Sequence, residues 1–235
     1  MGKDLFETST LVRNLFSLAS DVCSVDFRKM LFDSDLANLS LPANAILCTG
    51  LIERGCSLCA REHAIFPSAA AGYGIGALAA VAESRVLSET DYFRALRLLA
   101  DLVAAEDAPV QAGLSVIAER DITALSENLP PGVWLEAFAG DNHLVFSGTA
   151  NALAEFGKTI SSDVILLIER KPHCALHTPL SAAIAREMEK FIAKTRKYEP
   201  VIPIYVTTTG FLTMSAENIV TYIHDSLEKP VIWSR

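Results

Sequence analysis

A glycine-rich turn is the first group of residues in this 235-residue sequence whose types and spacing could support chemistry. It reads Gly72-Tyr73-Gly74-Ile75-Gly76 and lies between a segment typical of a strand and one typical of a helix. This is the frame of a nucleophile elbow, G-x-S-x-G, in which a strained turn lifts a serine onto a helix N-terminus. Because Gly74 occupies the serine position, the turn offers no oxygen nucleophile.

The same turn also fits the dinucleotide-binding pattern G-x-G-x-x-G/A through Gly72, Gly74 and Ala77. That function requires a βαβ unit with an acidic residue at the end of its second strand. The residues from Ser88 to Ala105 have helical spacing instead, with acids in the first turn, where they favour the helix dipole. Because that second strand is missing, a dinucleotide-binding module is an alternative and not the main prediction. A tight turn that binds no ligand is another alternative.

The cysteines and the histidines are the other two groups of residues whose types could support chemistry. Cys56-Ser57-Leu58-Cys59 has the C-x-x-C pattern of redox and metal sites, but zinc would need further ligands at suitable spacing. We predict that both cysteines act as small apolar residues on a buried helix face. The spacing of the five histidines matches no metal-binding pattern, so we expect no metal and no other cofactor. These histidines are His63, His143, His173, His177 and His224.

Composition excludes several classes of protein. Hydrophobic residues make up 51% of the chain, which rules out intrinsic disorder, and a net charge of −8 argues against nucleic-acid binding. Five cysteines in a chain of this length do not form a disulfide framework, and no signal-peptide pattern is present. We therefore expect a reduced, cytoplasmic protein. Residues 64–82 carry no charge but contain a proline and three glycines, which favours a strand, a turn and a helix over a membrane span.

Apolar spacing predicts the elements that must position the turn. Strands are expected over Pro67–Gly72 and Val201–Val206. Helices are expected over Thr8–Ser20, Asp26–Phe32, Ala43–Ala60, Ile75–Glu83, Ser88–Ala105, Pro179–Lys197 and Ser215–Leu227.

The middle of the chain has the order β-α-β-β-α-β, which is typical of a ferredoxin-like unit. We predict an α/β fold in which residues 111–171 form a ferredoxin-like small subdomain inserted into a core made of residues 1–110 and 172–235. The expected strands are Gly113–Ala118, Val133–Phe138, His143–Ser147 and Val164–Glu169, and the expected helices are Asp121–Glu127 and Thr149–Lys158.

The order of these segments resembles the malonyl-CoA:acyl-carrier-protein transacylase family over nearly the whole chain. Gly72–Gly76 aligns with that family's G-H-S-x-G elbow, and Gln111–Lys171 with its ferredoxin-like subdomain. Pro172-His173-Cys174-Ala175-Leu176 resembles its S-H-C-A-L-M segment, and Lys229-Pro230-Val231-Ile232-Trp233 its N-P-V-x-W segment. The resemblance implies a hydrolase-like acyltransferase core, here expected to be shortened at both ends.

The resemblance also implies roles for single residues. His173 is the family's catalytic histidine, whereas Gly74 replaces the serine, Tyr73 replaces the histidine before it, and Leu99 replaces the arginine that grips the malonyl carboxylate. A histidine without its nucleophile has nothing to activate. We therefore expect a non-catalytic binding or interaction protein of acyl-chain or polyketide biosynthesis, with a pocket at Gly72–Gly76.

The expected ligand is an acyl-CoA. The expected partner is an acyl-carrier protein, a synthase or a second copy that covers the shortened core. The alternative is an enzyme, with residual acyl transfer or thioester hydrolysis in which His173 activates water.

Overall fold

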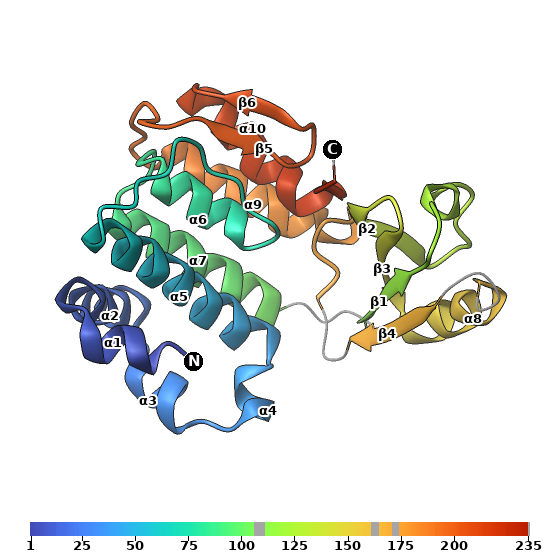
Figure 1. Ribbon diagram of the computed structural model, residues 1–235, viewed down its shortest axis with the longest axis horizontal. Helices are drawn as coiled ribbons and strands as arrows, with labels where there is room; N and C mark the ends of the chain where they lie inside the picture. The colour runs from blue at the N-terminus through green and yellow to red at the C-terminus, as the bar shows by residue number, and fades with distance from the viewer. Residues whose placement is uncertain (106–110, 161–164, 171–173, 235) are drawn as a thin grey trace.

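The computed structural model describes residues 1–105, 111–160, 165–170 and 174–234 of the chain. Two lobes lie side by side (Figure 1). The larger lobe contains most of the helices and a small two-stranded sheet, and the smaller lobe contains a larger sheet with one helix on it. The C-terminal segment lies between the two lobes (Figure 1). A mixed α/β fold was expected, and the structure has one.

Side-chain caps begin most helices of the N-terminal half. Ser9, Asp26 and Asp35 each accept a hydrogen bond from a backbone N–H of the helix that follows, which satisfies one of its unpaired donors. Pro42 occupies the first turn of the longest helix, where its missing N–H costs nothing. The helices are α1 (Lys3–Thr8), α2 (Thr10–Cys23), α3 (Phe27–Asp33), α4 (Leu36–Leu39) and α5 (Pro42–Glu62).

Two helices follow the glycine turn directly. Helix α6 spans Gly76–Glu83, and α7 spans Glu89–Ala104 with Ser88 as its N-cap, as expected. No strand lies between these two helices, so the βαβ unit that a dinucleotide site requires is not formed here.

The expected strand Pro67–Gly72 is wrong in extent. Only Ala70 pairs, through a single parallel bridge to Ile204. Its N–H donates to the Pro203 carbonyl at 2.9 Å, and its carbonyl accepts from the Tyr205 N–H at 2.8 Å. Alanine and glycine favour strands weakly, which is consistent with pairing over so short a stretch.

The C-terminal elements complete the larger lobe. The predicted helix Pro179–Lys197 divides into a 3-10 turn, η2, and a helix, α9, whereas the predicted strand Val201–Val206 shortens to β5. Strand β6, which pairs with β5, was not expected. The elements of the larger lobe are η2 (Pro179–Ser181), α9 (Ala182–Lys194), β5 (Ile204–Val206), β6 (Phe211–Thr213) and α10 (Ala216–Glu228). The last strand, β7 (Val231–Ile232), joins the sheet of the smaller lobe instead.

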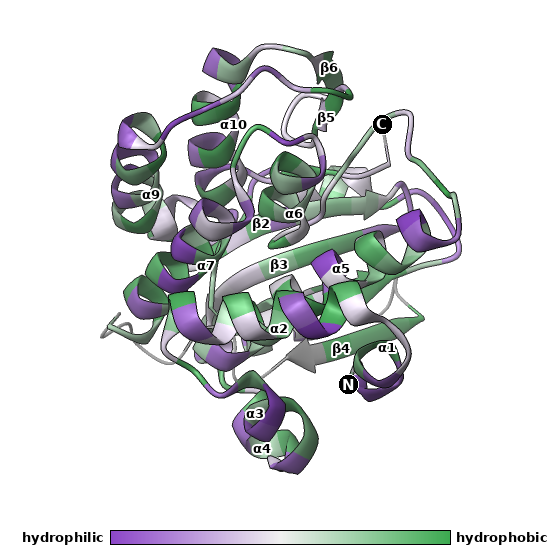
Figure 2. Ribbon diagram, turned by 90° about the vertical axis from the view of Figure 1, so that its left-hand side faces the viewer, coloured by the Kyte–Doolittle hydropathy of each residue, from purple (hydrophilic) through white to green (hydrophobic). Residues whose placement is uncertain are grey.

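The sheet of the smaller lobe has the strand order β4-β1-β3-β2-β7. Strands β1 to β4 pair in antiparallel fashion, and β7 from the end of the chain adds beside β2 in parallel. Hydrophobic residues run along β3, whereas the outer helices α3 and α9 carry mixed faces (Figure 2). The elements are β1 (Gln111–Ile117), β2 (Val133–Gly140), β3 (His143–Thr149), α8 (Ala150–Ile160) and β4 (Leu166–Arg170).

The expected helix Asp121–Glu127 is wrong. Only a 3-10 turn, η1 (Thr123–Ser126), is present. The Asp121 carboxylate accepts hydrogen bonds from both the N–H and the hydroxyl of Thr123, so it competes with helical hydrogen bonding. Asn128 then takes a positive φ of 54°, which ends the segment.

Two apolar cores underlie the two lobes. One is made of side chains from residues 12–103 and 176–227, and the other of side chains from residues 112–160. A small third cluster of Ala137, Val145 and Val231, with Tyr73 packed against it, joins the two lobes. Within the described residues, no helix is both long and apolar enough to span a membrane.

Candidate functional site

The glycine turn has the strained geometry of an elbow. Gly74 has a φ of +60°, a conformation that residues with side chains rarely adopt. A Cβ on Gly72 would lie 1.8 Å from the Gly76 carbonyl oxygen, so the chain crosses itself closely at this point. The N–H groups of Gly76 and Ala77 donate to the carbonyls of Tyr73 and Gly74, both at 3.0 Å, and so begin α6. The turn therefore presents residue 74 at the start of a helix.

A histidine faces this turn, and it is His177. A Cβ built on Gly74 would lie 3.5 Å from His177 Nε2. The backbone N–H of His177 donates to the Leu227 carbonyl at 2.6 Å, and its Nδ1 is hydrogen-bonded to the Ser226 carbonyl. Because a carbonyl oxygen only accepts, Nδ1 carries the proton in the neutral ring, which leaves the lone pair on Nε2. The base position of the ring therefore points at residue 74.

His173, the histidine chosen from the sequence, lies outside the described residues. His177 was missed because the resemblance placed the catalytic histidine at His173, and His177 itself was weighed only as a metal ligand. A local signal exists in Leu176–Ser181: His177 directly precedes Thr178, whose hydroxyl accepts from the Leu180 N–H, and Pro179 follows. A residue just before such a cap is held at the start of a helix.

Apolar side chains form the walls around residue 74. Tyr73 packs edge-to-face on Trp233, with ring centroids 5.8 Å apart, and its ring centroid lies 6.4 Å from that of His177. On the other side, a small cavity is lined by Gly74, Ile75, Ala77, Leu78, Leu99, Leu176, Ile223, Ser226 and Leu227.

Leu99 is the residue that was aligned with the family's arginine, and it is 1% exposed. The arginines near it in sequence are directed elsewhere. Arg97 is paired with Asp101 and Arg94 with Asp91, both on the surface of α7. No charged side chain is present among the described residues that line the small cavity.

The C-x-x-C prediction is corrected by the structure. Cys56 is exposed and Cys59 is half-buried, so the pair does not lie on a buried helix face. This side of α5 faces solvent, whereas Cys48, two to three turns earlier, is buried. The described residues contain no group of three or more His, Cys, Asp or Glu side chains that could hold a metal ion.

A larger groove of about 500 Å³ lies behind the elbow. Its lining residues come from α5, from the segment that precedes the elbow and from α6: Glu53, Arg54, Ser57, Ala60, Ile65, Pro67, Ala69, Ala70, Ala71, Gly72, Tyr73, Gly76, Ala79, Ala80 and Glu83. Arg54 and Glu83 are already paired with each other. Glu53 has no such partner: its Oε2 is buried without a hydrogen bond, and burial raises the pKa of the carboxyl to about 7.

Glu53 is therefore expected to make stability depend on pH. The unfolded chain releases this proton near pH 4.5 and the folded chain near pH 7, so stability falls as pH rises across that window. At 1.36 kcal/mol per pKa unit the fall is about 3 kcal/mol at most, and partial exposure reduces it to about 1–2 kcal/mol. The free energy of unfolding in urea is measured from pH 4.5 to 8 for the wild type and for Glu53→Gln. The difference between the two proteins at each pH gives the contribution of Glu53.

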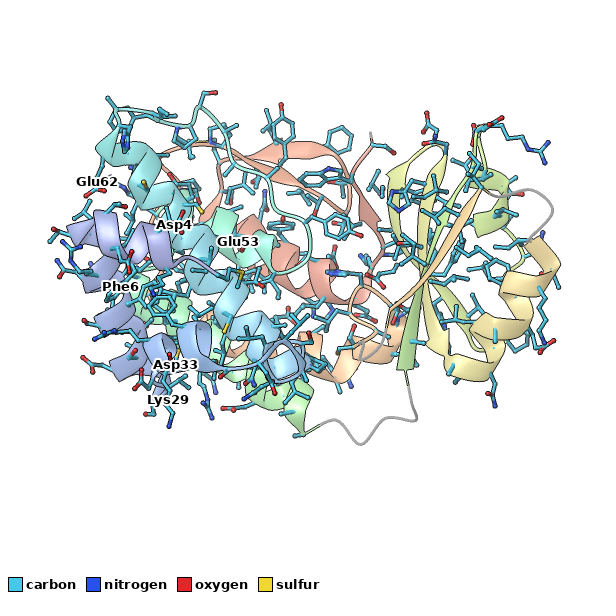
Figure 3. The ribbon with its side chains drawn as sticks, turned by 60° about the horizontal axis from the view of Figure 1, so that its bottom comes forward. Asp4, Phe6, Lys29, Asp33, Glu53 and Glu62 are labelled. Carbon is cyan, nitrogen blue, oxygen red and sulfur yellow. The ribbon has the colours of Figure 1, made fainter. Side chains whose placement is uncertain are left out.

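Glu62→Gln is the matched control, because Glu62 is an exposed carboxylate on the same helix. Glu53 lies midway along α5, and Glu62 lies at the end of the same helix (Figure 3). If the free energies of unfolding of the wild type and Glu53→Gln change in parallel between pH 4.5 and 7, the burial of Glu53 does not make stability depend on pH.

Comparison with known proteins supports the resemblance. No family model matches the chain. The chain is 30% identical to the spectinabilin polyketide synthase system protein NorA' of Streptomyces orinoci. That match extends over 154 residues, which are 64% of this chain and 4% of the much longer relative. Over its whole length this chain is 26% identical to the malonyl CoA-acyl carrier protein transacylase of Bacillus subtilis. The chain spans 60% of that second protein.

Solved structures show the same fold. The malonyl-CoA:acyl carrier protein transacylase from Helicobacter pylori superposes with a TM-score of 0.90 at 20% identity, over 99% of this chain and 77% of that one. The acyltransferase domain from the second module of the salinomycin polyketide synthase superposes with a TM-score of 0.86 at 21% identity. That superposition covers 99% of this chain and 55% of the other. The chain thus has the fold of the malonyl-CoA:acyl-carrier-protein transacylases, and it resembles that family in sequence.

Proposed function

We propose that this chain is an acyltransferase-like protein of acyl-chain or polyketide biosynthesis that binds an acyl thioester without forming an acyl-enzyme. The similarity to transacylases and to a polyketide synthase system protein supports the general assignment. Transfer through a covalent intermediate needs a nucleophilic atom on residue 74, next to the base. Glycine has no such atom, and this one observation carries the proposal.

The walls of the site favour a neutral acyl group. A malonyl carboxylate placed beside Leu99 would be desolvated without a cation to pair with, and an unpaired buried charge is costly. An acetyl group carries no such cost. The proposed ligand is therefore a non-carboxylated acyl-CoA.

An acyl-carrier protein is the proposed partner. One solved relative in fold is described as a type II polyketide synthase acyl-carrier protein in complex with its malonyl-transacylase. The same mode of delivery would bring an acyl-pantetheine arm to the site of this chain. Synthases and a second copy of the chain are the other proposed partners.

The division into domains is also a proposal. A core of residues 1–110 and 172–235, with a small subdomain of residues 111–171, agrees with the two separate apolar clusters. The strand order β4-β1-β3-β2 is that of a ferredoxin-like unit, and β7 extends it from the core side.

Thioester hydrolysis is the second candidate, and the orientation of His177 favours it. Nε2 faces the space that a serine side chain would fill, so a water molecule there could lose a proton to the imidazole. The resulting hydroxide would add to the thioester carbonyl. The thiol would then leave as its carbon–sulfur bond breaks and take up the proton, giving a carboxylic acid. His173 is the alternative base for the same step.

The first test is intact-protein mass after incubation with acetyl-CoA or malonyl-CoA, with free CoA measured in the same samples. We expect no adduct and equal CoA release from the wild type and His177→Ala. Calorimetry is expected to show acetyl-CoA binding about tenfold more tightly than malonyl-CoA, a difference of about 1.4 kcal/mol.

Two outcomes would change the assignment. CoA release that His177→Ala abolishes and His173→Ala leaves intact would establish hydrolysis at His177. A stable acyl adduct on the wild-type chain would overturn the binding proposal, because a side chain other than that of residue 74 would then act as nucleophile.

A further inference from the structure

A second groove lies at the opposite end of α6 from the elbow. Its volume of about 520 Å³ is within the range of small-molecule sites. The end of α5, the turn from α6 to α7 and residues 198–201 form its walls. Helix α6 has 8 residues, so the groove begins about 12 Å from the glycine turn. We call it the arginine groove, because Arg54, Arg61 and Arg85 all line it.

Backbone hydrogen bonds fix the walls of the arginine groove. The Tyr198 N–H donates to the Val86 carbonyl at 3.1 Å, and the Val201 N–H donates to the Ser84 carbonyl at 2.9 Å. Residues 198–201 are therefore held against the turn between α6 and α7. The groove is a built feature of the fold, with two of its walls tied together.

Much of the lining is apolar. Leu58, Leu87, Tyr198 and Val201 all contribute to it, and Tyr198 and Val201 are 44% and 56% exposed. The guanidinium of Arg196 lies over one face of the Tyr198 ring, 4.9 Å from its centroid. Covering exposed apolar surface with hydrocarbon is favourable, so the lining favours a ligand with a hydrocarbon body.

Most of the charges in the groove cancel one another. Glu83 accepts hydrogen bonds from Arg54 and Arg61, and Glu89 accepts from Arg54. These two arginines and two glutamates form a neutral network. The other charged side chains of the lining are Arg85 and Glu199, and both are exposed.

Arg85 has a backbone conformation that is unfavourable for a side chain. Its φ is 63°, and the N–H groups of Arg85 and Val86 donate to the carbonyls of Ala82 and Val81 at the end of α6. Glycine usually takes this position, because a Cβ is strained there. Among the described residues, the Arg85 guanidinium has no hydrogen bond or ion pair. A strained residue whose side chain gains nothing within the chain points to a ligand outside it.

Arg61 supplies a further donor to the same groove. Its Nε and Nη2 donate to one oxygen of Glu83, whereas its Nη1 has no acceptor in the part of the chain that the structure describes. Guanidinium N–H groups match the geometry of a carboxylate. Because Arg85 is the one cation of the lining that no glutamate pairs with, a single negative charge fits better than two.

We infer that the arginine groove binds a small organic acid with one carboxylate and a hydrocarbon body. The carboxylate accepts hydrogen bonds from Arg85 and from Arg61 Nη1. The hydrocarbon body covers Leu58, Leu87 and Val201. This site is separate from the one at Gly74, and the inference does not rest on the proposed acyl-CoA function.

Octanoate is the probe, and octanamide is its uncharged counterpart. By calorimetry, octanoate is expected to bind the full chain with a Kd below about 1 mM, and octanamide about tenfold more weakly. Affinity should rise about threefold to fourfold for each methylene added between butanoate and octanoate. In amide NMR spectra, octanoate should shift the signals of Arg85 and Leu87 and leave those of Gly74 and Gly76 in place.

Arg85→Gly is expected to separate binding from stability. The variant loses the guanidinium and also the strain, so octanoate affinity should fall about tenfold while Tm does not fall. Ser24→Gly is the matched control, because Ser24 also has a positive φ, 54°, and lies after α2, outside the groove. It should bind octanoate as the wild type does.

Two further variants change the charge of the groove in opposite directions. Val201→Asp places a carboxylate on an exposed part of the wall and is expected to weaken octanoate binding about tenfold. Glu199→Gln removes an exposed carboxylate and is expected to strengthen it. Neither change should affect the binding of octanamide.

Any one of four results would overturn the inference. Octanoate could fail to show saturable binding, or octanamide could bind equally well, which would remove the role of the carboxylate. Octanoate could shift only the signals of the glycine turn, which would place the acid at residue 74. Tighter binding by octyl phosphate than by octanoate would mean that the groove is a site for a doubly charged group.

Discussion

Gly74→Ser is expected to give a chain that becomes acylated on residue 74 when it is mixed with acetyl-CoA. The new Cβ would lie 3.5 Å from His177 Nε2, and one further bond brings a hydroxyl oxygen within hydrogen-bonding reach. The φ of +60° at residue 74 costs a side chain about 1–2 kcal/mol, which the packed turn can sustain. CoA release is expected to rise about 100-fold over the wild type, the lower range for a positioned base. Intact mass should show one acetyl group.

Two controls isolate the hydroxyl and the base. Gly74→Ala imposes the same strain at residue 74 without an oxygen, so it should form no adduct. Gly74→Ser combined with His177→Ala keeps the hydroxyl but loses the base, and it should form adduct far more slowly. A folded Gly74→Ser chain with no adduct would mean that the turn does not present residue 74 as a nucleophile position.

Gly72→Ala is expected to have the largest effect on stability. The new Cβ would lie 1.8 Å from the Gly76 carbonyl oxygen and 2.3 Å from the Ala77 nitrogen, and both are backbone atoms that cannot move without opening the turn. We expect the free energy of unfolding to fall by about 4 kcal/mol or more, out of a total of about 5–15 kcal/mol. Urea unfolding followed by circular dichroism measures this loss, and Tm should fall by about 10 °C.

Gly55→Ala is the matched control for the same chemical change. Gly55 lies inside α5, and its new Cβ would meet Val12 at 3.6 Å, an ordinary contact. Alanine is the better helix former, so this variant should be more stable by about 0.5–1 kcal/mol. If Gly72→Ala unfolded at the same urea concentration as the wild type, Gly72 would not lie as close to the backbone of Gly76 as the structure places it.

The sequence by itself determined the local features of this protein. Ser88 caps α7 and Asp26 caps α3, at the starts of the helices that were expected over Ser88–Ala105 and Asp26–Phe32. The hairpin between β2 and β3 turns where glycine, aspartate and asparagine follow one another, and the glycine turn lies directly before α6. These features depend on hydrogen bonds and backbone preferences within a few residues, so a single stretch of sequence contains what is needed to predict them.

Only the tertiary structure decided which residues meet at the site. His177 reaches Gly74 because Ser226 and Leu227, near the end of α10, hold its ring and its backbone. The exposure of Cys56 and the addition of β7 beside β2 were likewise set by packing between distant segments. Such contacts depend on how whole elements pack and on which hydrogen bonds remain unsatisfied. These contacts therefore cannot be predicted from the spacing of residues along the chain.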